Sequence, residues 1–271
     1  IDFEKPDGVL VQFGGQTPLK ISNMLANAGA PILGTSPINI DVAEDREKFG
    51  KILNKLDILC PTYGTGRSLE EVVEIADGIG YPVLARPSYV LGGRAMEIVY
   101  SQDQLIDYIA RSADVTKGHP ILIDQFLEDA FEFDVDALCD SEEVYIGAIM
   151  QHIEEAGIHS GDSACVLPPY QIKSSTIDDI EKITTLLSVE LNVKGLINIQ
   201  FAFKDDNLYV LEVNPRASRT TPFVSKSINV PLAKIAAQLS VGSKLKEFDL
   251  PEWSSIKHTS IKEAVLPFNK F

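Results

Sequence analysis

The stretch LINIQFAFKDDNLYVLEVNPRASR, residues 196–219, decides the fold of this chain and is predicted to form a β-hairpin. Apolar and polar residues alternate along its first half, the KDDN segment turns the chain, and the alternation resumes in the return strand. If an odd-length loop of residues 205–207 closes the hairpin, Gln200 pairs directly with Glu212, and Asn214 shares their face. Three oxygen-bearing side chains therefore meet on one small patch of sheet.

Such a patch, followed by arginines, is typical of a site for a metal and a phosphate. Carboxylate and amide oxygens suit a hard cation such as Mg²⁺, which binds one or two carboxylates plus substrate phosphates. Arg216 and Arg219 follow Pro215 and offer guanidinium donors for a phosphate or carboxylate. The alternative is a surface hairpin with a solvated polar face. We favour the site because the acceptors lie in apolar strands and the arginines stand at an otherwise uncharged helix entry.

Composition places the chain among mixed α/β proteins with a sizeable core. Its 271 residues can form one large or two modest domains, and helix-like and strand-like segments alternate. A formal net charge of −15 argues against a nucleic acid or an anionic membrane as partner. Any phosphate must then be bound by local arginines and glycine-rich backbone.

The cysteines and the chain ends carry weaker signals. Cys60, Cys139 and Cys165 form no CxxC pair, so we expect reduced core or near-core thiols in a cytoplasmic protein. No apolar run has the length of a membrane span, and no signal-peptide pattern is present. The start at Ile1 and the apolar motif VLPFNKF at 265–271 indicate a piece of a larger polypeptide.

The other segments follow from hydrophobic periodicity and from glycine and proline positions. Strands are expected at 8–13, 31–33, 81–85, 96–100, 121–126, 131–138 and 144–153, and helices at 17–28, 38–56, 69–79, 102–113, 176–191 and 223–239, the last interrupted at 229–231. Thr17 is the expected N-cap of the first helix. Strand 131–138 should point Glu132, Asp134 and Asp136 outward, with strand 144–153 as its antiparallel neighbour.

Two further segments have the composition of ligand-binding loops. After strand 81–85, Arg86 leads into RPSYVLGGRAM, whose glycine pair allows close backbone approach to a polyphosphate, although most such pairs are plain turns. The loop 154–163 is polar and contains glycine, as functional loops often do. Arg46 has an ordinary interpretation as a charge on a helix surface.

Taken together, these pieces resemble the large subunit of carbamoyl phosphate synthetase. The resemblance extends over essentially the whole chain, and VQFGGQTPLK, RPSYVLGGRAM and VLPFNKF resemble its C-terminal, carbamate-phosphorylating half. It is carried by residues 8–18 (GVLVQFGGQTP), 42–46 (VAEDR), 86–98 (RPSYVLGGRAMEI), 157–165 (GIHSGDSAC), 198–216 (NIQFAFKDDNLYVLEVNPR) and 219–226 (RTTPFVSK).

The resemblance implies an ATP-grasp fold of α+β lobes, preceded by the end of a Rossmann-like pre-ATP-grasp domain. Residues 1–36 would belong to that preceding domain and 37–245 to the ATP-grasp domain. Its lid lobe would span about 84–153, and 246–271 would begin the connection to a missing C-terminal region. In this fold ATP lies between two lobes.

The family's functional residues carry over onto matching positions of this chain. Gln200, Glu212 and Asn214 would bind two Mg²⁺ or Mn²⁺ ions, and Arg216 and Arg219 would steady the carbamate and the transferring phosphoryl group. The expected nucleotide contacts are Arg46, Arg86, Gly92, Gly93, Gln125, Leu127, Glu132, Gly157, Ile158, His159, Ser160, Gln200 and Glu212. The family also places a K⁺ near the nucleotide, and His152, Glu154 and Ser163 fall at those positions.

The implied reaction is ATP-dependent phosphorylation of carbamate to carbamoyl phosphate, which feeds pyrimidine and arginine biosynthesis. The implied partners are the N-terminal half of the same subunit and a glutaminase small subunit. One alternative is another ATP-grasp ligase, such as a biotin carboxylase or a purine-pathway carboxylate ligase. Those enzymes usually have lysine in place of Arg86 and lack the SYVLGGRAM run. The other alternative is a nucleotide-binding module that is inactive in isolation.

Overall fold

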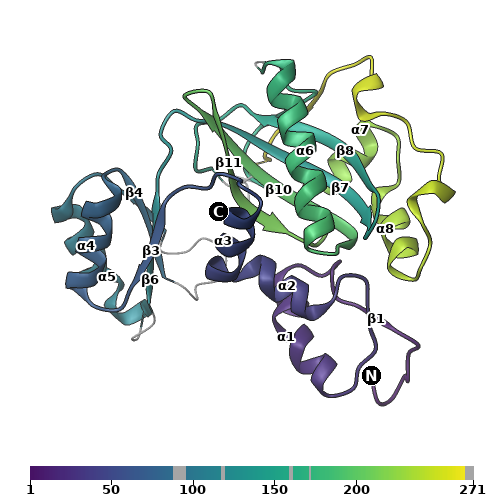
Figure 1. Cartoon of the computed structure of the whole chain (residues 1–271), viewed down its shortest axis with the longest axis horizontal. Coiled ribbons are helices and arrows are strands. Elements are labelled where there is room, and N and C mark those ends of the chain that lie inside the picture. Colours follow the sequence, from purple (N-terminus) through teal and green to yellow (C-terminus); the bar gives the residue numbers. More distant parts are fainter. Residues whose placement is uncertain (88–95, 117–119, 159–160, 171, 266–271) are drawn as a thin grey trace. The chain divides into compact units, whose positions relative to one another are not determined.

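The chain folds as a mixture of helices and sheets, and the two larger sheets are antiparallel (Figure 1). The computed structural model describes residues 1–87, 96–116, 120–158, 161–170 and 172–265. For residues 113–116 it describes the backbone but not the side chains. Two compact units divide the chain: unit 1 comprises Ile1–Leu59 and Phe131–Phe271, and unit 2 comprises Cys60–Ala130. No helix within the described ranges is long and apolar enough to cross a bilayer.

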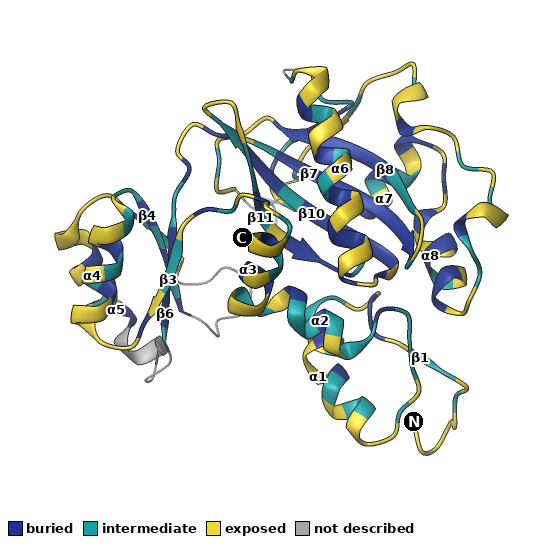
Figure 2. Ribbon diagram, viewed as in Figure 1, coloured by how far each residue is buried: buried dark blue, intermediate teal, exposed yellow. Residues whose placement is uncertain are grey.

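Unit 1 is built on a six-stranded sheet with the strand order β11-β10-β7-β8-β9-β12, in which all neighbours are antiparallel. The central strands are almost entirely buried (Figure 2). The strands are β7 (Phe131–Asp140), β8 (Val144–His152), β9 (Cys165–Leu167), β10 (Lys194–Lys204), β11 (Asn207–Asn214) and β12 (Ser260–Lys262).

The predicted hairpin is formed by β10 and β11, and Gln200 pairs with Glu212 as expected. The turn, however, has two residues rather than three. Asp205 and Asp206 both adopt positive φ angles of 50° and 58°, as in a type I′ turn. A bulge at Leu211 then shifts the register by one residue, which restores the pairing that the longer loop would have given.

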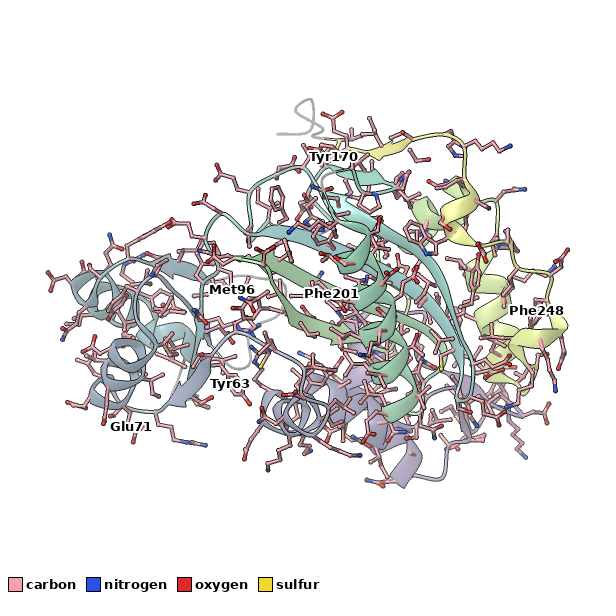
Figure 3. The ribbon with its side chains drawn as sticks, turned by 45° about the horizontal axis from the view of Figure 1, so that its top comes forward. Tyr63, Glu71, Met96, Tyr170, Phe201 and Phe248 are labelled. Atoms are coloured by element: carbon pink, nitrogen blue, oxygen red, sulfur yellow. The ribbon has the colours of Figure 1, made fainter. Side chains whose placement is uncertain are left out.

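Helices cover both faces of this sheet. Helix α6 (Ser174–Glu190) contacts β7, β8, β10 and β11 and crosses the sheet in Figure 1. Phe201, which is labelled in Figure 3, is fully buried on β10. The helices α7 (Thr221–Ser227) and α8 (Leu232–Ser240) also pack on the central strands. This double cover corrects one expectation: Asp134 and Asp136, predicted to face outward, are both 0% exposed.

The first 59 residues contain a small parallel pair, β1 (Val9–Leu10) and β2 (Ile32–Leu33), as expected for the end of a β-α-β unit. Helix α1 (Gln16–Asn27) starts after Gly15, so the prediction of Thr17 as N-cap is wrong. The single helix expected at 38–56 is two helices, α2 (Pro37–Glu44) and α3 (Arg46–Lys55). Asp45 has extended backbone between them, and its side chain caps α3 by accepting from two main-chain amides.

Unit 2 is a four-stranded antiparallel sheet in the order β3-β6-β4-β5, with two helices packed against its apolar residues. The expected strands 121–126 and 131–138 belong to different units, because β7 pairs with β8 and β10. This compact unit overlaps in part with the lid lobe expected at about 84–153, whose bounds stay a prediction. Its elements are β3 (Tyr63–Gly66), α4 (Leu69–Ile79), β4 (Val83–Pro87), β5 (Glu97–Val99), α5 (Gln102–Thr116) and β6 (Ile121–Gln125).

Candidate functional site

One face of the unit 1 sheet gathers the polar side chains that the sequence singled out, together with others that it did not. All of them have even residue numbers. Because successive side chains of a strand point to opposite faces and the strands pair in register, these side chains lie on the same face. We call this set the polar face: Glu132, Asp134 and Asp136 on β7, His152 on β8, Asn198 and Gln200 on β10, and Glu212 and Asn214 on β11.

The predicted metal ligands lie at the β10–β11 side of the polar face. Gln200 is half-buried and Glu212 is exposed, so their oxygens stay near solvent, whereas Asn214 is 5% exposed. Asn214 Oδ1 accepts a hydrogen bond from Arg216 Nη2 at 3.0 Å. The guanidinium also donates from Nη1 to the carbonyl of Ala217 at 3.1 Å, so both Nη atoms of Arg216 are hydrogen-bonded.

Two side chains from the N-terminal segment complete the surroundings of Arg216. In one orientation of the Gln16 side-chain amide, its nitrogen donates to Glu44 Oε1 at 3.0 Å. In that orientation the Gln16 side-chain oxygen accepts from Arg216 Nη2 at 3.3 Å. Partial burial raises the pKa of Glu44, the charge of Arg216 opposes this effect, and the charge of Glu212 adds to it. The motifs containing Gln16 and Glu44 therefore meet at the predicted metal ligands.

A buried ion triad occupies the centre of the polar face. His152 Nε2 lies 2.7 Å from Asp134 Oδ2, and His152 Nδ1 lies 3.4 Å from Glu132 Oε2, a distance that is long for a hydrogen bond. Burial alone would lower the pKa of His152, but Asp134, Cys165 and Glu132 together raise it to about 12. The protonated form of the imidazole is therefore favoured: Nε2 donates to Asp134, while Nδ1 faces Glu132 with no hydrogen-bond partner among the described residues.

Two of the expected nucleotide contacts in unit 1, Glu132 and Gly157, are joined by a hydrogen bond. Glu132 Oε1 accepts from the amide of Gly157 at 2.9 Å, which fixes the start of the loop after β8. Ile158 is exposed beside it, whereas His159 and Ser160 lie outside the described residues.

Arg46 lies elsewhere in unit 1, at the first position of α3. Its Nη1 donates to the carbonyl of Leu211 at 3.1 Å, so Arg46 contacts the bulge next to Glu212.

Unit 2 holds the remaining predicted contacts. Arg86 Nε donates to Asp124 Oδ2 at 3.2 Å across the β4–β6 pair. Gln125 Oε1 accepts from the amide of Thr62 at 3.3 Å, and Leu127 is 7% exposed. The glycine pair Gly92 and Gly93 lies outside the described residues.

The residues expected near K⁺ separate into two groups. Glu154 Oε2 accepts from Ser163 Oγ at 2.8 Å, and although burial acts in the opposite direction, this bond helps to lower the pKa of Glu154. His152 instead directs both ring nitrogens toward carboxylates. A protonated imidazole has no lone pair for a cation, so His152 does not fit as a ligand in this arrangement.

The donor set fits Mg²⁺ through Gln200, Glu212 and Asn214, all of which present oxygen. Within the described ranges, no cluster of three or more His, Cys, Asp or Glu side chains is arranged to hold a metal. A cation at Glu212 would therefore depend on further oxygens, such as those of a nucleotide. Asn214 Oδ1 would have to release its bond from Arg216 in order to bind such a cation directly.

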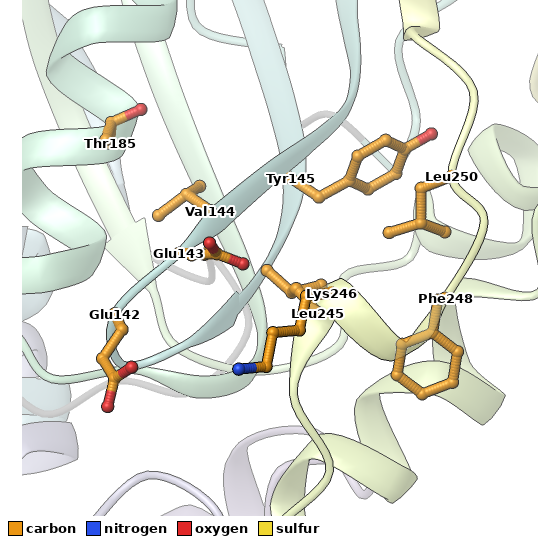
Figure 4. Close-up of a pocket in the computed structure, with 9 residues that line it drawn as sticks. All are labelled: Glu142, Glu143, Val144, Tyr145, Thr185, Leu245, Lys246, Phe248 and Leu250. Carbon is orange, nitrogen blue, oxygen red and sulfur yellow. The ribbon is translucent and has the colours of Figure 1, made fainter.

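A cavity of about 480 Å³ lies apart from the polar face, between the β7–β8 turn and the segment after α8 (Figure 4). Its described lining contains none of the predicted site residues, and Tyr145 and Phe248 supply its aromatic walls. We therefore place the candidate site on the polar face, where the chemistry lies. The cavity is lined by Glu142, Glu143, Val144, Tyr145, Thr185, Leu245, Lys246, Phe248 and Leu250.

The sequence reasoning missed Asp134, Asp136 and Asn198. Asn198 Nδ2 lies 3.0 Å from Asp134 Oδ1 and 3.3 Å from Asp136 Oδ1 and so bridges the two carboxylates. Burial raises the pKa of Asp136 to about 6 despite its hydrogen bonds to Thr220 and Ser218. Pairing the alternating run of β7 with that of β10 would have indicated these residues, because both runs carry polar groups at the same parity.

Comparison with known proteins identifies the family of both parts of the chain. The family model described as "Carbamoyl-phosphate synthase L chain, ATP binding domain" matches residues 45–248, and "Carbamoyl phosphate synthase preATP-grasp domain" matches residues 1–42. The carbamoyl phosphate synthase large chain of Archaeoglobus fulgidus is 61% identical over 267 residues, covering 98% of this chain and 25% of that protein. The chain thus spans about a quarter of the length of such relatives.

Two further matches bear on the half of the protein and on the fold. A Methanocaldococcus jannaschii protein named as the C-terminal section of the large chain is 56% identical, covering 97% of this chain and 44% of that protein. Biotin carboxylase from Campylobacter jejuni superposes with a TM-score of 0.77 at 15% identity, covering 96% of this chain and 59% of that one. The expected ATP-grasp fold is confirmed.

Proposed function

Because the chain belongs to the carbamoyl-phosphate synthase large-chain family, we propose that it phosphorylates carbamate with ATP as the C-terminal half of such a subunit. The similarity to a C-terminal section supports this half over the N-terminal one. The N-terminal half, a glutaminase small subunit and a cytoplasmic location are parts of the same proposal. Arg86, where biotin carboxylases and purine-pathway ligases usually have lysine, favours this reaction over theirs.

The observation that carries the proposal is the register of the hairpin, which sets Gln200 directly opposite Glu212, with Asn214 two residues further along. These residues would hold Mg²⁺, which when bound would neutralise charge on the β- and γ-phosphates of ATP. The carbamate oxygen attacks the γ-phosphorus, its new P–O bond replaces the bond to ADP, and ADP leaves with the electron pair. Arg219, exposed beyond the strand, offers its guanidinium to the phosphoryl group in transfer.

Arg216 has a different part in this proposal, because its guanidinium is engaged with Asn214 and with the carbonyl of Ala217. It keeps the Asn214 amide in place and adds positive charge beside Glu212. The protein therefore supplies position and charge, while the covalent change is confined to carbamate and ATP.

The test is the reverse reaction, ATP formation from ADP and carbamoyl phosphate, since it avoids unstable carbamate. We expect the full-length large chain to form ATP, and Glu212→Gln to slow this reaction roughly 100-fold by removing the carboxylate. Glu143→Gln is the matched control, because Glu143 is exposed at the β7–β8 turn, away from the polar face. ADP binding without ATP formation in the wild type would instead identify a nucleotide-binding module.

A further inference from the structure

A fully buried carboxylate, Asp136, has no part in the phosphoryl transfer proposed above. It lies in the middle of β7, where its Cα neighbours are Asn198 on β10 and Ala148 on β8, and its exposure is 0%. A buried carboxylate is costly unless hydrogen-bond donors surround it. Its donors therefore indicate what the residue holds in place.

Two of these donors come from the segment that follows β11. Ser218 Oγ donates to Asp136 Oδ1 at 2.7 Å, and Thr220 Oγ1 donates to Oδ2 at 2.6 Å. The third donor is the Asn198 amide at 3.3 Å. Short hydroxyl–carboxylate bonds of this kind are among the stronger hydrogen bonds in proteins. Both oxygens of Asp136 are thus committed to one segment, residues 218–220.

The same segment carries the arginine that we assign to the transferring phosphoryl group. Arg219 stands between the two hydroxyl residues, and its own side chain is exposed. Ser218 Oγ also accepts from the amides of Thr220 and Thr221, where α7 begins, so this hydroxyl joins the helix start to Asp136. The backbone on either side of Arg219 is therefore fixed to β7 by one carboxylate.

A second anchor holds the start of this segment. Gln12 Nε2 donates to the carbonyl of Pro215 at 2.8 Å, and the amide of Ala217 donates to the carbonyl of Gln12 at 2.9 Å. These bonds fix residues 215–217. The direction of the chain through Arg219 then depends on the contacts with Asp136.

We propose that Asp136 is a positioning residue for Arg219, because its buried carboxylate fixes the backbone on both sides of that arginine. This inference rests on the proposed function and deepens it. A misplacement of about 1 Å at a group that acts on the transition state can lower the rate by roughly 100-fold. Nucleotide affinity should change little, because Asp136 itself is shielded from any ligand by its burial.

The experiment measures ATP formation from ADP and carbamoyl phosphate by the full-length large chain, with kcat and the KM for ADP determined separately. We expect Asp136→Asn and Thr220→Val each to lower kcat roughly tenfold or more while the KM for ADP stays within about threefold. Thr220→Ser keeps the hydroxyl and should restore the wild-type kcat. A residue that supported only the fold would change the melting temperature without this split.

Thr184→Val is the matched control, because Thr184 is equally buried and its hydroxyl has no hydrogen-bond partner among the residues that the structure describes. It should keep the wild-type kcat. If Asp136→Asn fails to fold, the pair Thr220→Val and Thr220→Ser carries the test. An unchanged kcat in Thr220→Val, or an equal loss in Thr220→Ser, would overturn the inference. A wild-type protein that forms no ATP would overturn the proposed function instead.

Discussion

Arg46 donates from Nη1 to the main-chain carbonyl of Leu211 at 3.1 Å, at the bulge that sets Glu212 opposite Gln200. The amide of the preceding residue, Val210, donates to the carbonyl of Leu59 at 2.8 Å. The bulge residue Leu211 and its neighbour Val210 are therefore each hydrogen-bonded to a residue outside the sheet. Bulges commonly redirect a side chain next to a functional site, and here the redirected residue is the predicted metal ligand.

Replacing Arg46 by methionine removes the charge and keeps the length of the side chain. We expect the dissociation constant for Mg-ADP to rise roughly tenfold, because a hydrogen bond to a charged group contributes about 1.5–3 kcal/mol. Isothermal titration calorimetry measures this constant. Lys51→Met is the matched control, since Lys51 is exposed on the same helix and pairs only weakly with Glu47 at 3.4 Å. Equal losses in both variants would remove Arg46 from the nucleotide site.

Glu212 and Asn214 should differ in their importance for the cation. Glu212→Gln removes the carboxylate, so we expect Mn²⁺ affinity, measured by electron paramagnetic resonance in the presence of ADP, to fall by more than about tenfold. Asn214→Asp keeps an oxygen that can accept from Arg216 Nη2. We therefore expect this variant to lose no more than about threefold in Mn²⁺ affinity. Equal effects of the two substitutions would contradict the central role given to Glu212.

His152 should remain protonated well above neutral pH. Its pKa in the folded state, about 12, lies above the usual 6.5, so its contribution to stability is complete below pH 6.5 and is lost as pH rises toward 12. The stability difference between the wild type and His152→Asn should therefore shrink by up to about 1.4 kcal/mol per pH unit above pH 7. Urea unfolding at several pH values measures this difference.

Imidazole ¹⁵N chemical shifts provide the direct check. The His152 ring should keep the shifts of an imidazolium at pH 9. A neutral His152 ring at pH 8 would show that Asp134 and Glu132 do not hold the proton, and His152 would again be available as a cation ligand.

Local patterns were enough to predict the hairpin and the pairing of Gln200 with Glu212, but not the way in which that pairing arises. A three-residue turn and a two-residue turn followed by a bulge give the same register, and alternation cannot distinguish them. Similarly, the periodicity of residues 38–56 continues through Asp45, although the backbone there is extended and the side chain caps the next helix.

The buried part of the candidate site could not be predicted from one strand alone. The alternation in β7 assigns Asp134 and Asp136 to one face, but whether that face meets solvent depends on α7 and α8, which lie about 85–105 residues later in the sequence. Asn198 lay within the quoted hairpin, yet its partners are on β7. Contacts of this kind belong to the tertiary structure.

Arg86 and Arg219 should affect different kinetic constants. Arg86 Nε is bonded to Asp124 Oδ2 at 3.2 Å, and its side chain is 36% exposed. Asp124 thus fixes one end of the guanidinium, and the remaining donors can bind phosphate oxygens equally in the ground state and the transition state. Interactions that are equal in both states affect affinity, so Arg86→Ala should mainly raise the KM for ATP.

Arg219 is exposed on the segment held by Asp136, and its contacts should strengthen as charge develops on the transferring phosphoryl group. Arg219→Ala should therefore lower kcat by roughly 100-fold and leave the KM for ATP nearly unchanged. The assay is carbamoyl phosphate synthesis by the full-length enzyme over a series of ATP concentrations. Arg111→Ala and Lys226→Ala are matched controls, because both side chains are exposed cations outside the assigned site. If Arg219→Ala raised only the KM for ATP, Arg219 would contact bound nucleotide rather than the phosphoryl group in transfer, and the inference about Asp136 would lose its target.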